Sequence, residues 1–310
     1  MSSFPHRVSI TEVGLRDGLQ MEDRILSTSE KLSLAQALID AGHTSLELTS
    51  FVSPARVPQL ADAAELFAAL RHVHEVEFKA LVPNIRGAER AIAADADALV
   101  FVLSASDTHG RRNLNRTPRE SLAELRGIVA MATDAGTRVD LSLSVAFGCP
   151  FEGDVPVETV VELARDAQQA GIARMTFCDT TGMATPRQVQ ALAVGLRDEL
   201  PAIDPAFHFH NTRGLGLVGV LVALQEGIER FESSVGGLGG CPFAPYAAGN
   251  VCTEDMVHML HELGIETGLD LTSLTEAARL AEQLVGRRLD GMVMKAGPRL
   301  ASSAKDESCG

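Results

Sequence analysis

The sequence predicts an α/β protein, a (β/α)8 TIM barrel with a C-terminal helical extension. Runs typical of strands alternate eight times with longer helical patterns along the 310 residues. These runs are almost continuously apolar, as at 98–103, which favours a parallel sheet covered by helices. A barrel of this kind uses about 250 residues, and no Pro/Ser-rich linker divides the chain before its end.

The predicted strands are short and evenly distributed. In chain order they cover residues 7–13, 45–49, 76–82, 98–104, 138–146, 173–178, 206–210 and 230–235. A helical pattern follows each strand, and several of these helices begin at Ser, Thr or Pro, as at Ser27, Thr117 and Thr185. A further helix is expected at 271–285. We therefore assign residues 1–288 to the catalytic barrel and its extra helix, and residues 289–310, which end in a polar run, to a tail or a lid.

Composition restricts the classes of partner. The chain has 27 Lys and Arg against 41 Asp and Glu, a formal charge of −14, which disfavours nucleic acid and anionic membranes. Trp is absent and aromatic residues make up 4%, so the core is expected to be aliphatic. The longest apolar stretch, 215–224, is about half the length of a membrane-spanning helix.

The cysteines favour a cytoplasmic location. There are five of them, far apart and without a Cys-x-x-Cys motif, which indicates neither a disulfide framework nor a zinc ribbon. The N-terminus leads directly into a strand pattern and lacks the apolar run of a secretion signal.

Polar side chains gather where the predicted strands end, which in such a barrel is the catalytic face. The seventh strand carries His208 and His210, and alternation predicts that both point into the barrel while Phe207 and Phe209 face the helices. One buried His is usually a satisfied core residue, but two on one face near a strand end, with Asp17 available across the barrel, favour a metal site.

The expected ligand set combines nitrogen and oxygen atoms. Asp17, His208, His210 and Asn250 suit Mg²⁺ or Mn²⁺ in octahedral geometry, although two His and one carboxylate also suit Fe(II). Near this set, Glu47 and Asp179 are interpreted either as acceptors that orient the ligands or as structural ion-pair partners.

Two glycine-rich segments have competing interpretations. In 236–242, Cys241 is either an acid or nucleophile on a mobile loop, or a small residue in a turn. In 214–219, the pattern G-x-G-x-x-G with Glu232 further on resembles a dinucleotide fingerprint. We favour close packing at a helix start, because the preceding strand supplies the two His.

Several motifs together resemble the 3-hydroxy-3-methylglutaryl-CoA lyase family, in order and over about residues 7–287. They lie at 12–20, 49–54, 147–153, 208–212, 237–242 and 249–250. Related condensing enzymes such as isopropylmalate synthase typically carry Asn-Asp after His-x-His and lack the Gly-Leu-Gly-Gly-Cys-Pro loop. Here Asn211 precedes Thr212 and the loop is complete, which favours a lyase.

The resemblance implies cleavage of 3-hydroxy-3-methylglutaryl-CoA to acetyl-CoA and acetoacetate, a reaction of leucine catabolism, with a divalent cation. By resemblance, the metal ligands are Asp17, His208, His210 and Asn250, and the catalytic residues are Arg16, Cys241, Asp17, Glu47, Asp179 and His208. Arg16, Gln20, Ser50 and Thr180 are expected to bind substrate. The base is left open between Asp17, His208 and a water on the metal.

Segment 107–112 departs from the animal-type pattern, which leaves the acyl group open. Citramalyl-CoA or another branched 3-hydroxyacyl-CoA is the alternative substrate, and a metal-binding barrel without turnover is the non-enzymatic alternative. A cationic patch for the CoA phosphates, or a solvated charged face, is expected at Arg111, Arg112, Arg116 and Arg119. A homodimer is an open alternative to a monomer.

Overall fold

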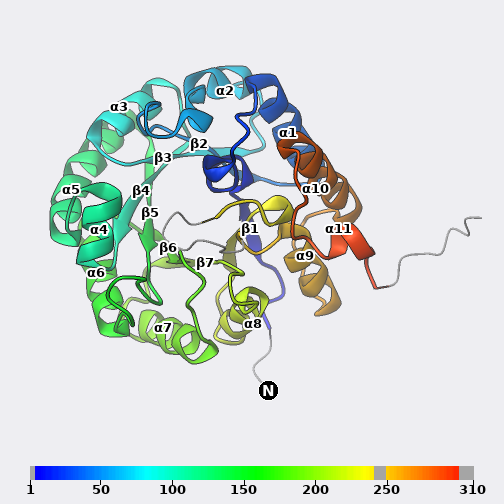
Figure 1. Ribbon diagram of the computed structural model, residues 1–310. Helices are drawn as coiled ribbons and strands as arrows, with labels where there is room; N and C mark the ends of the chain where they lie inside the picture. Colours follow the sequence, from blue (N-terminus) through cyan, green and yellow to red (C-terminus); the bar gives the residue numbers. More distant parts are fainter. Residues whose placement is uncertain (1–3, 241–248, 300–310) are drawn as a thin grey trace, which may run out of the picture.

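The computed structural model describes residues 4–240 and 249–299, and within them the predicted barrel is confirmed. Eight parallel strands pair in sequence order, and β8 closes on β1 (Figure 1). The strands are β1 (Ser9–Glu12), β2 (Ser45–Ser50), β3 (Glu77–Val82), β4 (Ala98–Ser104), β5 (Arg138–Ser144), β6 (Arg174–Asp179), β7 (Asp204–Phe209) and β8 (Arg230–Ser233).

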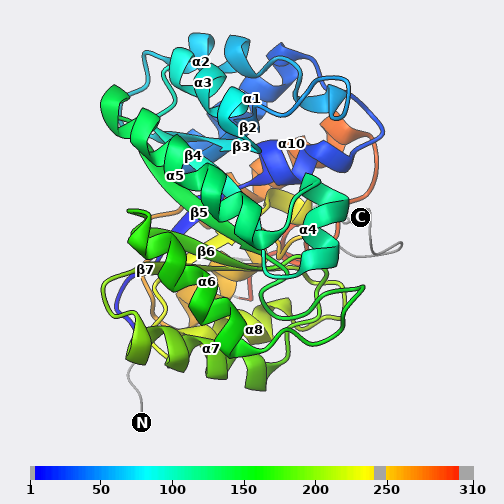
Figure 2. The same ribbon diagram turned by 90° about the vertical axis from the view of Figure 1, so that its left-hand side faces the viewer.

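Helices form the outer ring of the barrel. They are α1 (Thr28–Asp40), α2 (Ala63–Leu70), α3 (Ile85–Ala93), α4 (Asp107–Leu114), α5 (Pro118–Ala135), α6 (Val157–Gln169), α7 (Pro186–Glu199), α8 (Gly216–Gln225), α9 (Thr253–Glu262), α10 (Leu271–Val285) and α11 (Val293–Ala296). Ser27, Thr117 and Thr185 each cap a helix through a reciprocal capping box, as their sequence context predicts. The fourth unit has an additional short helix, α4, beside α5 (Figure 2).

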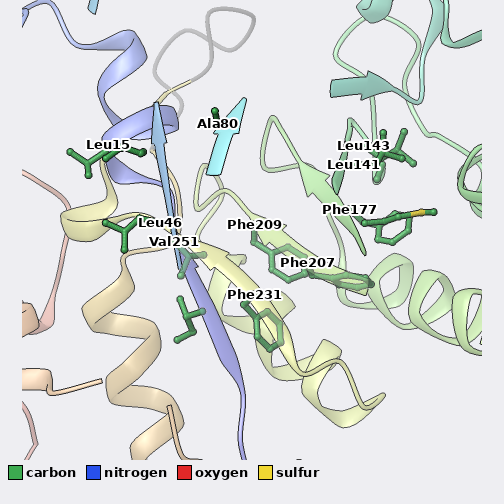
Figure 3. Close-up of a cluster of buried hydrophobic side chains, with 14 of the residues drawn as sticks. Leu15, Leu46, Ala80, Leu141, Leu143, Phe177, Phe207, Phe209, Phe231 and Val251 are labelled. Atoms are coloured by element: carbon green, nitrogen blue, oxygen red, sulfur yellow. The ribbon is translucent and has the colours of Figure 1, made fainter. Parts of the chain in front are cut away.

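The apolar core lies between the strands and the helices. Phe207, Phe209 and Phe231 from β7 and β8 belong to this core, and the Phe207 ring packs edge-on against both Phe177 and Phe209 (Figure 3). The alternation predicted for β7 is therefore confirmed, because His208 faces the opposite side. The core is aliphatic around most of the ring, with a phenylalanine cluster at β6 to β8.

The barrel interior, by contrast, is largely polar. Lys79 is buried and its Nζ lies 3.2 Å from Asp140 Oδ2 and 3.5 Å from Glu77 Oε2. Such buried charges persist because each has a partner of opposite sign.

Strand ends differ from the prediction by a few residues. The first strand was expected to reach residue 13 but stops at Glu12, because the backbone next enters a π-helical turn, Gly14–Gly18. The seventh begins earlier, at Asp204, and ends at Phe209, while His210 forms an isolated bridge with Asn250.

The C-terminal helix predicted at 271–285 is confirmed as α10. The packed body continues past residue 288, where we expected a tail, since Leu289, Val293 and Met294 are buried and Arg279 Nη2 donates to Met294 O at 3.0 Å. In residues 4–240 and 249–299, no helix has the length and apolar character required to cross a membrane.

Candidate functional site

A five-residue turn presents two charged side chains at the carboxyl end of β1. The amide at the end of the π-helical turn Gly14–Gly18 donates to Val13 O at 3.2 Å. Its first glycine approaches Glu12 so closely that a Cβ there would lie 2.6 Å from Glu12 Oε1. This compact turn directs the adjacent side chains of Arg16 and Asp17 into the site, and π-helical turns often occur where function requires such placement.

Asp17 and two imidazoles converge across the barrel. Asp17 Oδ2 lies 3.7 Å from His210 Nε2 and 4.0 Å from His208 Nε2, and all three side chains are buried. Asn250 Nδ2 donates to Asp17 Oδ2 at 2.8 Å and to Leu238 O at 3.0 Å, whereas Asn250 Oδ1 is buried without a hydrogen-bond partner among the described residues. The four predicted ligands therefore lie together.

This donor set fits a divalent cation. Within the described residues, Asp17, His208 and His210 offer ligand atoms that all lie within 4.8 Å of one another. An unpartnered buried amide oxygen costs free energy unless something occupies it, and a cation bound by Asn250 Oδ1 would do so. Carboxylate, amide and imidazole ligands are compatible with Mg²⁺ or Mn²⁺.

Electrostatics keep Asp17 ionised. Burial alone would raise the pKa of Asp17, but Arg16, His208 and His210 together hold it well below its usual range. Burial lowers the pKa of His210 to about 4, with His208 adding to the effect, so His210 is neutral at physiological pH. Ionised carboxylate and neutral imidazole are the states in which these groups bind metal ions.

Arg16 is held by two carboxylates. Its Nε donates to Glu47 Oε1 at 2.5 Å, its Nη2 to Glu47 Oε2 at 3.3 Å, and its Nη1 to Asp17 Oδ1 at 2.5 Å. Burial opposes the charged guanidinium, but Glu47 and Asp17 outweigh it and raise the pKa of Arg16. Of the two interpretations of Glu47, the structure therefore favours an ion-pair partner that orients Arg16.

Sequence reasoning missed Glu232. Its Oε2 lies 3.0 Å from His208 Nδ1, and its Oε1 accepts from Thr176 Oγ1 at 2.8 Å. Alternation with Phe231 was a signal that Glu232 points into the barrel. Its register partner on β7, His208, is given by the structure. Burial opposes ionisation, yet His208 and Lys79 lower the pKa of Glu232.

Asp179 makes a different set of contacts. Its Oδ1 accepts the backbone N–H groups of Met183 and Ala184 at 2.6 and 3.0 Å, which fixes the loop after β6. Burial raises the pKa of Asp179 to about 6. Among the described residues, Asp179 does not belong to the group of possible metal ligands formed by Asp17, His208 and His210. Its role as a catalytic acid stays a prediction.

A cavity of about 760 Å³ opens from the ligand cluster toward α4. Gln20 and Thr180 line it, and Gln20 Nε2 donates to Asp17 Oδ1 at 2.9 Å. Thr180 Oγ1 accepts from Val145 N at 2.9 Å. Ser50 is buried and is not among the described residues that line the cavity.

Of the four arginines expected to form a cationic patch, Arg112 and Arg116 line the cavity. Arg112 stacks on Phe151, 4.1 Å from the ring centroid, and Arg116 pairs with Glu124. Arg111 and Arg119 are exposed and do not line this cavity.

The packing interpretation of 214–219 is confirmed. A Cβ at Gly216 would lie 2.4 Å from Val251 Cγ2, and one at Gly219 would lie 2.9 Å from the Phe209 ring, so both glycines allow α8 to approach the barrel. Cys241 lies outside the described residues.

The chain is similar to known proteins over most of its length. The HMGL-like family model matches residues 7–281. A hydroxymethylglutaryl-CoA lyase of Bacillus subtilis is 41% identical over 286 residues, 92% of this chain and 96% of that protein. An (R)-citramalyl-CoA lyase of Chloroflexus aurantiacus is 40% identical over 301 residues, 94% of this chain and 95% of that protein.

The chain is also similar to solved structures, in sequence and in fold. An HMG-CoA lyase of Acinetobacter baumannii, determined with coenzyme A and 3-methylmalate, superposes with a TM-score of 0.91 at 40% identity. The alignment covers 96% of this chain and 98% of that one.

Proposed function

This chain belongs to the HMGL-like family, and from that premise we propose that it is a metal-dependent lyase that cleaves 3-hydroxy-3-methylglutaryl-CoA to acetyl-CoA and acetoacetate. The observation that carries the proposal is the convergence of Asp17, His208, His210 and Asn250 beside Arg16 at the base of the cavity. This combination supplies a cation site and a fixed positive charge next to each other, where a carbon–carbon bond of a thioester substrate can be broken.

We assign the cation to Asp17, His208, His210 and Asn250 Oδ1, and propose Mg²⁺ or Mn²⁺ because two of these ligand atoms are hard oxygens. When bound, such a cation supplies Lewis acidity toward substrate oxygen atoms. The protein side chains prepare the site for the cation. Asp17 stays ionised, and His208 and His210 direct Nε2 toward it.

The reaction requires three changes in the substrate. The tertiary hydroxyl loses its proton to a base, for which the candidates are Asp17, His208 and a water on the metal. The bond between C2 and C3 breaks as C3 becomes a ketone, and the electron pair passes to C2 as a thioester enolate. Arg16 is always charged and is fixed by Glu47 and Asp17, so it can stabilise the negative charge on the enolate oxygen without reorganising. Protonation of C2 then gives acetyl-CoA, and we propose Cys241 as the donor.

The CoA portion of the substrate would lie along the outer part of the cavity. Arg56 and Arg112 line this cavity and provide positive charge for phosphates in a protein of net charge −14, whereas Arg116, also in the lining, is already paired with Glu124. Gln20 and Thr180, which also line the cavity, are the proposed acyl contacts, together with Ser50 at the end of β2. A cytoplasmic location and a role in leucine catabolism complete the proposal.

Citramalyl-CoA is a second candidate substrate. The citramalyl-CoA lyase relative is as similar in sequence as the hydroxymethylglutaryl-CoA lyase relative. One small group in an apolar pocket changes discrimination by only about 1–3 kcal/mol, so the two activities can overlap.

Product analysis decides between these substrates. The protein is incubated with hydroxymethylglutaryl-CoA, citramalyl-CoA and further branched 3-hydroxyacyl-CoA thioesters, with Mg²⁺ or Mn²⁺, and kcat/KM is compared. We expect acetoacetate and acetyl-CoA from hydroxymethylglutaryl-CoA, lost on exhaustive chelation and restored by the cation. Absence of acetoacetate together with rapid cleavage of another thioester would assign that substrate instead, and no cleavage of any thioester would leave a binding protein.

A further inference from the structure

A buried hydrogen-bond chain reaches His208 through the ring nitrogen that does not face Asp17. Glu232 Oε2 lies 3.0 Å from His208 Nδ1, and Thr176 Oγ1 donates to Glu232 Oε1 at 2.8 Å. These side chains come from β6, β7 and β8, and each residue is at most 7% exposed. A line of hydrogen bonds from three strands of the barrel therefore ends at a single imidazole.

The hydrogen bond with Glu232 determines which nitrogen of the His208 ring carries the proton. An ionised carboxylate only accepts hydrogen bonds, so the contact with Glu232 requires a hydrogen on His208 Nδ1. In the neutral ring, which is the form that binds a metal ion, the other nitrogen, Nε2, then presents a lone pair toward Asp17 Oδ2, 4.0 Å away. Because Glu232 Oε1 is tied to Thr176, the carboxylate cannot rotate freely, and the ring plane of His208 is fixed as well.

We propose that Glu232, held by Thr176, is a positioning residue that fixes the tautomer and the ring orientation of His208 for a divalent cation. The proposal rests on the metal site of the proposed function and assigns a role to a residue outside the ligand set. His210 provides an internal contrast, since its Nδ1 is buried without a hydrogen-bond partner among the described residues. The two imidazoles thus differ in their hydrogen bonds, because Glu232 contacts the ring of His208 and not that of His210.

Two substitutions at Glu232 separate position from charge. In Glu232→Gln, the amide oxygen can still accept from His208 Nδ1 while the amide nitrogen faces Thr176 Oγ1, so the tautomer is retained. In Glu232→Leu, the acceptor is lost and both tautomers become available. Loss of such a partner typically weakens metal binding 10- to 100-fold, so we expect the Leu variant to show a loss in this range and the Gln variant a loss under about tenfold.

Mn²⁺ binding is measured by electron paramagnetic resonance titration, without substrate. Glu77→Gln and Glu77→Leu serve as controls, because Glu77 is also a carboxylate in ion pairs but is partly exposed at the start of β3, at the amino end of the barrel. Both controls should leave the Mn²⁺ affinity unchanged. Thr176→Val keeps the carboxylate but releases its Oε1, and should weaken Mn²⁺ binding by less than Glu232→Leu does.

The tautomer itself is read from two-bond ¹H–¹⁵N spectra of the metal-free, ¹⁵N-histidine-labelled protein, recorded at an alkaline pH at which the His208 ring is neutral, with His208→Gln identifying the His208 signals. We expect the Nδ1–H pattern in native protein and in Glu232→Gln, and a mixed pattern in Glu232→Leu. Native-like Mn²⁺ affinity in the Leu variant, or equal losses in the Gln and Leu variants, would overturn the proposal. If the Leu variant does not fold, an unchanged affinity and an unchanged His208 pattern in Thr176→Val would overturn it instead. Failure of native protein to bind Mn²⁺ would refute the proposed metal site, while the spectra would still test the tautomer.

Discussion

Replacing Glu254 by Gln should stabilise this protein at neutral pH. Glu254 is the second residue of α9 and is 0% exposed. Its Oε2 accepts the Gly236 N–H at 3.0 Å, but its Oε1 is buried without a hydrogen-bond partner among the described residues. The N-terminus of a helix favours a carboxylate by about 0.3–1 kcal/mol, whereas burial disfavours it more strongly and raises the pKa of Glu254 to about 8.

The size of the effect follows from the difference in pKa between the folded and unfolded states. The ordinary value is 4.5, so the folded protein holds this proton more tightly than the unfolded chain does. The stability it confers is fully present below pH 4.5 and is lost as the pH rises toward 8. At about 1.4 kcal/mol per unit of pKa, the native protein loses about 3 kcal/mol between pH 5 and pH 7.5. A Gln side chain does not ionise and avoids this loss.

Urea unfolding at pH 5 and at pH 7.5 tests the prediction. The difference in unfolding free energy between Glu254→Gln and native protein should grow by about 3 kcal/mol from the lower to the higher pH. Glu262→Gln, a substitution at the partly exposed last residue of the same helix, is the matched control and should change by less than about 0.5 kcal/mol. A Gln variant less stable than native protein at pH 7.5 would refute the reasoning, because it would mean that the helix N-terminus and the Gly236 contact outweigh burial.

Three further substitutions address the site and its support. Asp17→Asn should weaken Mn²⁺ binding at least about tenfold because the anionic ligand is lost, as measured by the same titration; native affinity would contradict the ligand assignment. Cys241→Ser should retain Mn²⁺ binding and lose at least about 10²-fold in turnover, whereas near-normal turnover would make Cys241 a turn residue. Gly219→Ala should lower the thermal midpoint, because its methyl group would lie 2.9 Å from the Phe209 ring, an overpacking that costs about 1–3 kcal/mol against a gain in helix propensity of up to about 1 kcal/mol. An unchanged or higher midpoint would show that α8 shifts without cost.

The features that could be predicted from the sequence are those encoded within single elements. Alternation in β7 sufficed to place His208 and His210 inside the barrel, and local capping signals such as Thr117 located helix starts. The order of the strands followed from their parallel character and short connections, so the shared face of Asp17 and Asn250 could be expected before the structure.

Features that depend on register and on side-chain competition were out of reach. Whether Glu47 contacts a metal ligand or an arginine depends on where the π-helical turn directs Arg16. A single π-helical turn after a strand leaves no mark in the pattern of apolar residues. The contacts of Asp179 were equally out of reach, because its hydrogen bonds with backbone amides of the loop after β6 depend on the path of that loop. Pairing of Glu232 with His208 requires the register between β7 and β8, which neither strand contains alone.

The charges of the described cluster favour a cation of charge +2 over a cation of charge +1. Asp17, Glu47 and Glu232 contribute three carboxylates and Arg16 contributes one guanidinium, which leaves a formal −2 in a buried region. Buried charge of one sign is costly unless it is compensated nearby, and Lys79, which also acts on Glu232, forms its ion pairs with Glu77 and Asp140 and is not in contact with the cluster. A divalent cation between Asp17, His208 and His210 would cancel the remaining charge at the point where the carboxylate and both Nε2 atoms meet. The same balance explains why Arg16 is retained beside the site: without it the cluster would carry −3, and a divalent cation would leave one carboxylate buried and uncompensated.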